Sequence, residues 1–479
     1  ASTAPFWILA AALGGLAAFF LVRPFLQDLP AYRPRRGSRA FDYWPLVLGA
    51  FVPYAWALRA ALRGMRLRPA VLLGTTGLVL AAFVPAPAQQ SQDVYQYLIY
   101  GEMALHGVSP LAVPPYLFGS PWLAYSAFQS TPSVYGPVWT ALSAAVVWMG
   151  GSLMGAFLVM KALAAALGVA AAAGLARSAG DGPAWLTPTV SVVAFGLNPL
   201  VVVSTGLGAH ADVAIAAAFA WAIVAERRGR PAATTALLAA AALVKPYAGI
   251  ALVVWLIALW KRRGAPAVLL HAGACAVLAT GSFAPYWEGA DTFRGLARIG
   301  GNVSSSIVGT LVRLISGVHD ATAGSTTAGT VGRVVAATIL LAALVGIARS
   351  PRTAGEPWRA AALVSVVYVL VTPWYLYWHL LGALALVVAS AEPALVAGTL
   401  TFSGSSLIVA GASQTRFGSA GSLLQLALRY GPPLAASRWA ARRYTAPRAD
   451  HDPGGHDGRL RRRDGAPRGA RAPGGAGDA

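Results

Sequence analysis

Long apolar runs separated by short polar or basic segments recur along most of the 479-residue chain. Many of these runs approach the roughly 20 residues that an α-helix needs to cross a lipid bilayer. The pattern therefore predicts an all-α polytopic membrane protein with about 13–15 transmembrane helices. The candidate spans cover residues 5–22, 42–58, 70–86, 136–150, 155–176, 186–205, 210–225, 231–244, 247–260, 266–284, 331–348, 360–372, 374–390, 394–412 and 420–436.

Two longer polar stretches and a polar tail interrupt this pattern. We assign residues 1–437 to one transmembrane domain that carries a loop at 87–135 and a second loop at 285–330. Residues 438–479 are rich in Gly, Pro and Arg and have little to bury, so they predict a disordered, basic cytoplasmic tail. Pro199 and Gly206 interrupt the run at 186–210, which makes it the best candidate for a half-length or re-entrant helix.

The composition supports the membrane class. Hydrophobic residues make up 57% of the chain and charged residues 11%, against about 25% charged in soluble domains. The net charge of +20 is concentrated in short basic clusters between apolar runs, for example at 227–230, 261–263 and 349–359. Such clusters are typical of cytoplasmic loops of a multi-pass plasma-membrane protein, which places the loop at 285–330 on the extracytoplasmic side. We expect the loop at 87–135 on the same side, although the basic segment 33–39 would then also lie outside, against this rule. No basic face interleaved with aromatic residues suggests a nucleic-acid partner.

Asp93 is the first candidate for chemistry. The chain has only 17 acidic residues, and five of them lie in the tail, which leaves 12 for the apolar body. Asp93 follows the apolar run 70–86 and is surrounded by tyrosines and an amide. A carboxylate in this position is typical of the general base of a membrane enzyme.

The residues after Asp93 form a pattern that suits a polyhydroxylated ligand. On a helix, Asp93, Gln96, Tyr97 and Tyr100 share one face. The carboxylate can accept a proton, the amide and phenols can bond hydroxyl groups, and the rings can stack on the apolar side of a sugar. The alternative is an interfacial helix with an aromatic belt. The candidate binding residues of this loop are Tyr95, Gln96, Tyr97, Tyr100, Glu102, His106 and Tyr135; Glu102 and His106 alternatively pair with each other at i, i+4.

Further candidates come from four segments downstream. His210 and Asp212 flank a membrane helix, where they either hydrogen-bond each other and organise the site or bind a ligand. Lys245 is either a phosphate partner or a lysine that extends to the interface from a helix end.

The segment 372–379 contributes Trp374, Tyr375 and His379, which either line a groove for a lipid carrier or form an aromatic belt. Arg294 and Arg298 are spaced to grip a phosphate, or alternatively to pair with Asp291.

Several classes of protein lose support. The chain has no phosphate-binding P-loop, no dinucleotide fingerprint, no nucleophile elbow and no HExxH sequence. The i, i+2 spacing of His210 and Asp212 does not place both on one helical face, and no third ligand is near in sequence. We therefore predict no required cofactor and no metal ligand, and we regard a divalent metal as the less favoured alternative.

An ordered set of motifs resembles a known family. The segments are Asp93–Tyr97 followed by Tyr100-Gly101, Gly107–Pro110, Tyr135–Trp139, Asn198–Leu200 with His210–Asp212, Leu243–Lys245 and Thr372–Tyr375. Together they resemble GT-C glycosyltransferases. More narrowly, they are similar to the actinobacterial polyprenyl-phosphomannose-dependent α-1,6-mannosyltransferases that build lipomannan and lipoarabinomannan.

The resemblance implies a GT-C fold, a polyprenyl-phosphate-mannose donor, a glycolipid or mannan acceptor, and transfer outside the membrane. The loop aspartate of the family is its presumed base and corresponds to Asp93, while Lys245 or Arg294 would stabilise the departing lipid phosphate. Many GT-C members carry two acids close together in this loop, whereas Glu102 lies nine residues after Asp93. Transfer of arabinose or glucose is the alternative within this class, and a lipid-linked sugar flippase or transporter is the alternative outside it.

Overall fold

The fold is described by a computed structural model, which places residues 2–26, 44–88, 91–180, 182–299, 306–316, 327–412 and 418–445. The chain is 81% helical, and the described residues contain no β-strand. The predicted all-α class is confirmed.

The α-helices follow the apolar runs along the chain. They are α1 (Ala4–Leu26), α2 (Trp44–Gly49), α3 (Phe51–Leu62), α4 (Pro69–Ala82), α5 (Asp93–Leu105), α6 (Pro137–Gly150), α7 (Leu153–Ala179), α8 (Pro188–Ser191), α9 (Pro199–Val202), α10 (Asp212–Arg227), α11 (Pro231–Val244), α12 (Gly249–Phe283), α13 (Arg294–Ile299), α14 (Ile307–Ser316), α15 (Thr327–Arg349), α16 (Arg352–Gly355), α17 (Pro357–Val371), α18 (Leu380–Ser390), α19 (Pro393–Ala412) and α20 (Gly418–Thr445). Short 3-10 helices are η1 (Pro115–Leu117), η2 (Pro121–Tyr125), η5 (Pro246–Ala248), η6 (Ala284–Tyr286), η7 (Gly289–Phe293) and η8 (Tyr377–His379), and π-helical turns are η3 (Val192–Gly196) and η4 (Val203–Leu207).

Glycine and proline break the apolar runs where the sequence suggests. Gly264 has a φ of 78° and divides α12 into two arms that match the two predicted spans 247–260 and 266–284. The run at 186–207 is interrupted at Asn198-Pro199, where its two halves bend by 54° and form either a broken span or a re-entrant loop. Asn198 accepts a hydrogen bond from the Leu200 N–H and so begins the second half.

Five helical segments within the described residues are long and apolar enough to cross a membrane, or six if the bent pair is counted as one span. A further set of apolar helices is shorter, including Pro137–Gly150, Pro231–Val244 and Pro357–Val371. The chain is therefore a helical membrane protein, and the number 13–15 stays a prediction.

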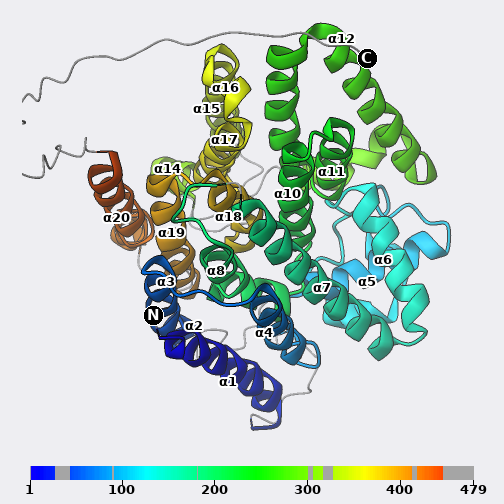
Figure 1. The fold of residues 1–479 in the computed structure, drawn as a ribbon. Helices are drawn as coiled ribbons and strands as arrows, with labels where there is room; N and C mark the ends of the chain where they lie inside the picture. The colour runs from blue at the N-terminus through cyan, green and yellow to red at the C-terminus, as the bar shows by residue number, and fades with distance from the viewer. Residues whose placement is uncertain are drawn as a thin grey trace, which may run out of the picture.

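Four helices run between the same two ends of the molecule (Figure 1). α10 and α18 begin near the cavity described below and end among basic residues, whereas α11 and α17 run in the opposite direction. Arg262 bonds both Glu226 at the end of α10 and the Ala354 carbonyl, and Lys261 donates to the Ser350 carbonyl. Basic clusters that are far apart in sequence thus meet at one end of the bundle, which we call the basic end.

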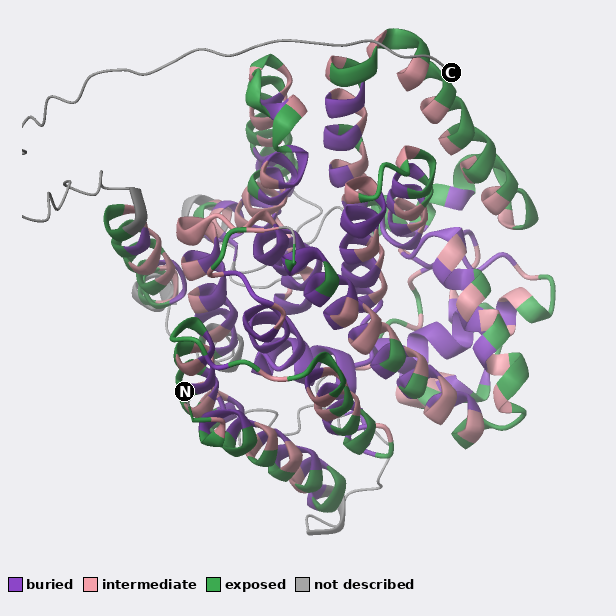
Figure 2. Cartoon of the chain, in the orientation of Figure 1, coloured by how far each residue is buried: buried purple, intermediate pink, exposed green. Residues whose placement is uncertain are grey.

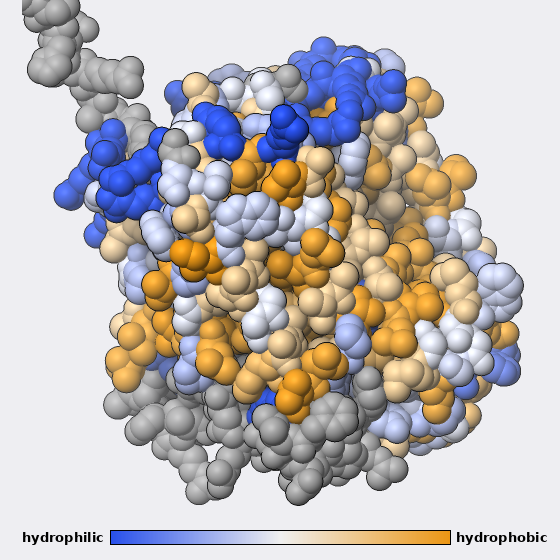
Figure 3. Space-filling model, turned by 60° about the horizontal axis from the view of Figure 1, so that its bottom comes forward, coloured by the Kyte–Doolittle hydropathy of each residue, from blue (hydrophilic) through white to orange (hydrophobic). Residues whose placement is uncertain are grey.

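The helices in the middle of the bundle are buried, while the peripheral helices expose apolar side chains (Figure 2). The second arm of α12 exposes Leu269, Leu270 and Val277, each by more than 70%. Figure 3 shows an apolar surface across the middle of one face, with hydrophilic side chains gathered toward an edge. An apolar exterior of this kind suits contact with lipid rather than with water.

The predicted tail and the two predicted loops contain helical segments. The tail expected to be disordered from residue 438 instead begins with the last turns of α20, which continue to Thr445 because the run Arg438–Tyr444 contains good helix formers. The rest of that tail, residues 446–479, lies outside the described residues. The predicted loop 87–135 contains α5, η1 and η2, and the loop 285–330 is described only in part.

Candidate active site

A cavity of about 300 Å³ lies at the end of the bundle opposite to the basic end. Most of its lining residues lie at or near helix ends. They come from the start of α5, the segment before α6, the end of α11 and the connection from α17 to α18. Its lining residues are Asp93, Gln96, Tyr100, Phe128, Thr131, Val134, Tyr135, Lys245, Pro246, Tyr247, Leu296, Arg333, Tyr368, Thr372, Pro373, Trp374, Leu376, Trp378 and His379. Sequence segments separated by almost 300 residues therefore meet at one site.

Asp93 is the first residue of α5 and is only 6% exposed. Its Oδ2 lies 3.2 Å from the His210 Nδ1 and accepts a hydrogen bond of 3.3 Å from the Tyr135 hydroxyl. Burial alone would raise the pKa of the Asp93 carboxyl, but its hydrogen bond with His210 and the nearby Lys245 ammonium outweigh burial and hold that pKa below its ordinary value. Asp93 is therefore ionised at neutral pH.

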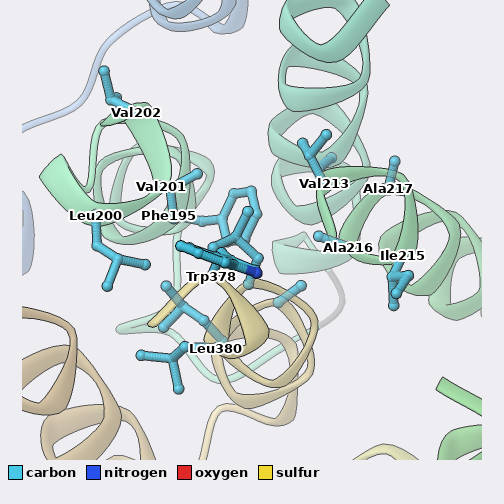
Figure 4. Close-up of a cluster of buried hydrophobic side chains, with 14 of the residues drawn as sticks. Phe195, Leu200, Val201, Val202, Val213, Ile215, Ala216, Ala217, Trp378 and Leu380 are labelled. Carbon is cyan, nitrogen blue, oxygen red and sulfur yellow. The ribbon is translucent and has the colours of Figure 1, made fainter. Parts of the chain in front are cut away.

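His210 is held in place by an unusual turn. Ala209 has a φ of 49°, a left-handed conformation that costs a non-glycine residue about 1 kcal/mol. Gly208 leaves room for the imidazole, since a Cβ there would lie 2.6 Å from the ring. The ring stacks on Trp378 with centroids 3.8 Å apart, and Figure 4 shows Trp378 close to Phe195 and between the bent helix pair and α10.

Asp212 belongs to a separate cluster. Of the two alternatives for His210 and Asp212, a bond between them is not formed, because each side chain has another partner. Asp212 accepts hydrogen bonds of 2.6 Å from both the Lys245 Nζ and the Tyr247 hydroxyl, and it does not line the cavity. Lys245 also lies 5.1 Å from the centre of the Tyr135 ring, so Tyr135 connects the two clusters.

The predicted face of α5 is directed to the site. Gln96 and Tyr100 line the cavity next to Asp93, and their polar atoms bond the following loop, with Gln96 accepting from Ser126 and Tyr100 donating to the Thr131 carbonyl at 2.8 Å. Tyr97 lies one layer deeper, where its hydroxyl accepts from the Ala211 N–H at 3.3 Å. This face holds the loop 126–131 and the His210 turn in place.

Several predicted binding residues lie away from the cavity. Tyr95 is buried on the other side of α5, stacked on Phe157. Tyr375 packs against Phe402.

Glu102 and His106 are not an ion pair. Glu102 accepts from the Ser120 hydroxyl at 2.5 Å, and His106 is exposed and bonds the Glu102 backbone carbonyl. Both residues organise the loop after α5 rather than the cavity.

The two arginines of α13 do not line the cavity either. Arg294 pairs with the exposed Asp291 at 2.6 Å, as the alternative prediction held. Arg298 donates to the Ser130 carbonyl at 3.0 Å and so fastens α13 to the loop after α5.

Among the lining residues that the sequence does not single out are Tyr247, Arg333, Tyr368 and Trp378. Tyr247 and Tyr368 stack with centroids 5.2 Å apart, and Arg333 approaches from α15. Trp378 belongs to the aromatic run 372–379, which was recognised as a whole. Tyr247 lies two residues after the candidate Lys245, and this proximity could have identified it as a lining residue. No local sequence pattern distinguishes Tyr368 or Arg333 from other residues of apolar helices.

Within the described ranges, no three His, Cys, Asp or Glu side chains lie close enough together to hold a metal ion. The absence of a required metal or other cofactor stays a prediction.

A family model described as alpha-(1->6)-mannopyranosyltransferase, N-terminal domain, matches residues 7–261. The matched segment contains Asp93, Tyr135, His210, Asp212 and Lys245. No curated protein and no solved structure matches the chain significantly. Since the match covers more than half of the sequence, the chain belongs to the α-(1→6)-mannopyranosyltransferase family, and the membership predicted from the ordered motifs is confirmed.

Proposed function

We propose that this α-(1→6)-mannosyltransferase takes mannose from polyprenyl-phosphate-mannose and adds it, with inversion, to a growing α-1,6-mannan of lipomannan or lipoarabinomannan. The observation that carries the proposal is the ionised Asp93 carboxylate at the wall of a cavity of about 300 Å³, with His210 and Tyr135 against one of its oxygens. A cavity of this size accommodates a sugar and part of its leaving group. We place the chain in the GT-C superfamily on the sequence resemblance.

In the proposed step, the acceptor hydroxyl oxygen attacks the anomeric carbon of the donor mannose. The bond between that carbon and the phosphate oxygen breaks, its electron pair leaves with the polyprenyl phosphate, and the hydroxyl proton passes to Asp93. His210 stabilises the carboxylate before transfer from 3.2 Å. A positioned base of this kind contributes about 10²- to 10⁴-fold to a rate.

Two basic side chains that line the cavity, Lys245 and Arg333, can bind the phosphate of the donor. Lys245 lines the cavity, although Asp212 already accepts a hydrogen bond of 2.6 Å from its ammonium. Arg333 lines the cavity from α15. We therefore assign the lipid phosphate to the space between Lys245 and Arg333, in place of Arg294, whose guanidinium pairs with Asp291.

The aromatic side chains of the cavity suit the sugar and the start of the lipid. Tyr368, Trp374 and Trp378 provide flat apolar surfaces on which a pyranose ring can stack. Phe128 and Val134 leave an apolar wall for the first isoprene units. Glycolipid, mannan and polyprenyl lipid are thus the proposed partners.

The proposed sidedness follows from the two ends of the bundle. Lys261, Arg262 and Arg359 lie at the basic end, and the cavity lies at the opposite ends of α10, α11, α17 and α18. Basic loops of membrane proteins face the cytoplasm. The active site is therefore proposed to face the extracytoplasmic side of the plasma membrane.

The test measures transfer of labelled mannose from polyprenyl-phosphate-mannose to a short α-1,6-mannoside, using the purified full chain. Asp93→Asn removes the base without changing its size, and we expect turnover to fall at least about 100-fold. The matched control is Asp291→Asn, which alters an exposed carboxylate that pairs only at the surface, and it should retain turnover within about twofold.

Equal turnover of wild type and Asp93→Asn would place the base elsewhere. If the wild type transfers no mannose, the donor is wrong; the polyprenyl-phosphate forms of arabinose and glucose are then tested in the same assay. Movement of a fluorescent lipid-linked sugar across proteoliposomes without any transfer would favour the flippase.

A further inference from the structure

Lys161 is a buried lysine in the middle of an apolar helix. It lies in α7, a segment of 27 residues that qualifies as a membrane span, and it is 0% exposed. A charged side chain at such a position is costly and marks a functional requirement unless it is paired. Within the described part of the chain, no carboxylate lies within ion-pair distance of Lys161.

Two backbone carbonyls hold the ammonium group instead. The Lys161 Nζ donates to the Ala86 carbonyl at 3.0 Å and to the Leu207 carbonyl at 3.1 Å. The ring of Phe157, one turn earlier on α7, lies 5.7 Å away. Both carbonyls follow or end helical segments, where C=O groups lack helical partners and carry partial negative charge.

The two bonded segments lead directly to the site. Ala86 belongs to the connection that runs from α4 to Asp93 at the start of α5. Leu207 ends the bent helix pair, and His210 follows three residues later. One ammonium group thus joins the two segments whose next functional residues are Asp93 and His210, the pair at 3.2 Å.

The surrounding packing shows that this junction is tight. A Cβ on Gly206 would lie 2.9 Å from the Cβ of Phe83, so the two segments touch across a glycine. Gly168, two turns after Lys161 on the same face of α7, would meet Leu80 at 2.8 Å and Thr205 at 3.0 Å if it carried a Cβ. α7 therefore offers one face, from Lys161 to Gly168, that fixes both segments together.

We infer that Lys161 is a positioning residue that sets the distance between the base Asp93 and its partner His210. The inference rests on the proposed function, since it assigns to Lys161 a role in the same reaction. An apolar side chain of similar length would fill the same volume without the cost of a buried charge, so packing alone does not explain a lysine here.

The experiment compares Lys161→Met, which keeps the volume and removes both hydrogen bonds, with Tyr54→Phe. Tyr54 donates to the Ala194 carbonyl at 3.0 Å and accepts from the Asn198 Nδ2 at 3.1 Å, so its variant also loses two buried hydrogen bonds, but near the break of the bent pair and not at the Leu207 end that leads to His210. We expect Lys161→Met to lower kcat about 10- to 100-fold, because small displacements of reacting groups have effects of this size. The KM for the donor should stay within about threefold, and the acid limb of the pH–rate profile should move toward neutral pH.

Tyr54→Phe should reduce thermal stability and leave the acid limb in place. If Lys161→Met only lowers the yield of folded protein, with kcat and the acid limb of the folded fraction as in wild type, Lys161 is structural and the inference is wrong. If Lys161→Met does not accumulate, Lys161→Gln, which keeps an amide donor, is measured by the same criteria.

A second readout does not depend on the reaction. Hydrogen–deuterium exchange of Lys161→Met should be faster than in wild type in peptides covering 84–88 and 205–213, and unchanged in α20. Unchanged exchange in both peptides would overturn the inference. If the wild type transfers no mannose, the proposed function fails by itself, and the exchange result still decides whether Lys161 holds the two segments.

Discussion

Two buried carboxylates lie near one cavity, and their surroundings are opposite. Asp212 receives two hydrogen bonds of 2.6 Å, from Lys245 and Tyr247, and is closed off from the cavity. Asp93 lines the cavity, and its nearest polar partners, His210 and Tyr135, lie at 3.2 and 3.3 Å from a single oxygen.

This difference distinguishes an aspartate that holds neighbouring side chains in place from an aspartate that can act as a base. A carboxylate whose oxygens are both taken by short, charge-assisted bonds is stabilised as an anion and has little capacity to accept a proton. A carboxylate that lines the cavity and is bonded at longer distances, through one oxygen, is better placed to accept a proton from a substrate. Sequence alone ranks both aspartates as candidates, and only their partners distinguish the proposed base from the residue that holds Lys245 in place.

The largest effect is expected from a substitution that disrupts the cluster of Asp212, Lys245 and Tyr247. Asp212→Asn leaves Lys245 buried without its counter-charge, and loss of one partner of a buried pair costs about 3–5 kcal/mol. We expect a marked drop in Tm of the detergent-purified protein, measured by differential scanning fluorimetry. The double variant Asp212→Asn/Lys245→Met removes both charges and should recover part of that loss. Wild-type Tm for Asp212→Asn together with a 100-fold loss of turnover would reverse the roles of the two aspartates.

A second test sharpens the description of Asp93. His210 and Lys245 lower the Asp93 pKa against the effect of burial, so the wild-type acid limb due to Asp93 lies on the acidic side of the ordinary carboxyl pKa. His210→Gln removes the imidazole that lowers the Asp93 pKa, so this pKa rises. The base is therefore protonated at higher pH, and the acid limb of kcat/KM should move toward neutral pH. An acid limb at its wild-type position would show that His210 does not control Asp93.

A smaller effect is expected on the phosphate side of the cavity. Arg333→Gln keeps a polar side chain and removes the charge that lines the cavity from α15. Hydrogen bonds to charged groups contribute about 1.5–3 kcal/mol, and solvent reduces this at a half-open site. We expect the KM for the lipid-phosphate donor to rise about tenfold with kcat within threefold, measured at saturating acceptor. An unchanged KM would move the phosphate toward Lys245 alone.

The smallest effect serves as the matched control. Arg298→Gln changes an exposed arginine that bonds Ser130 and does not line the cavity. Donor KM and kcat should both stay within about twofold, and a tenfold rise in KM would bring Arg298 into the phosphate site.

Sequence patterns were sufficient where interactions are local. Apolar runs predicted the longer apolar helices, the break at Asn198-Pro199 and the two arms of α12 at Gly264, because Pro and Gly act on their own turn of the helix. The shared face of Asp93, Gln96 and Tyr100 likewise follows from the period of one helix.

Patterns failed where partners come from other elements. Glu102 and His106 have the spacing of a pair, yet Ser120 provides a nearer donor to Glu102. His210 and Asp212 are two residues apart, yet the left-handed turn at Ala209 sends one to Asp93 and the other to Lys245.

The sequence by itself determined the helical membrane class, the family and the aspartate at the start of α5, because these depend on composition, local periodicity and short motifs. The tertiary structure alone decided which carboxylate faces the cavity, that Tyr368 and Arg333 line it, and that Lys161 joins the segments leading to Asp93 and His210. These properties depend on contacts between helices distant in sequence, and no local pattern encodes which helices will meet.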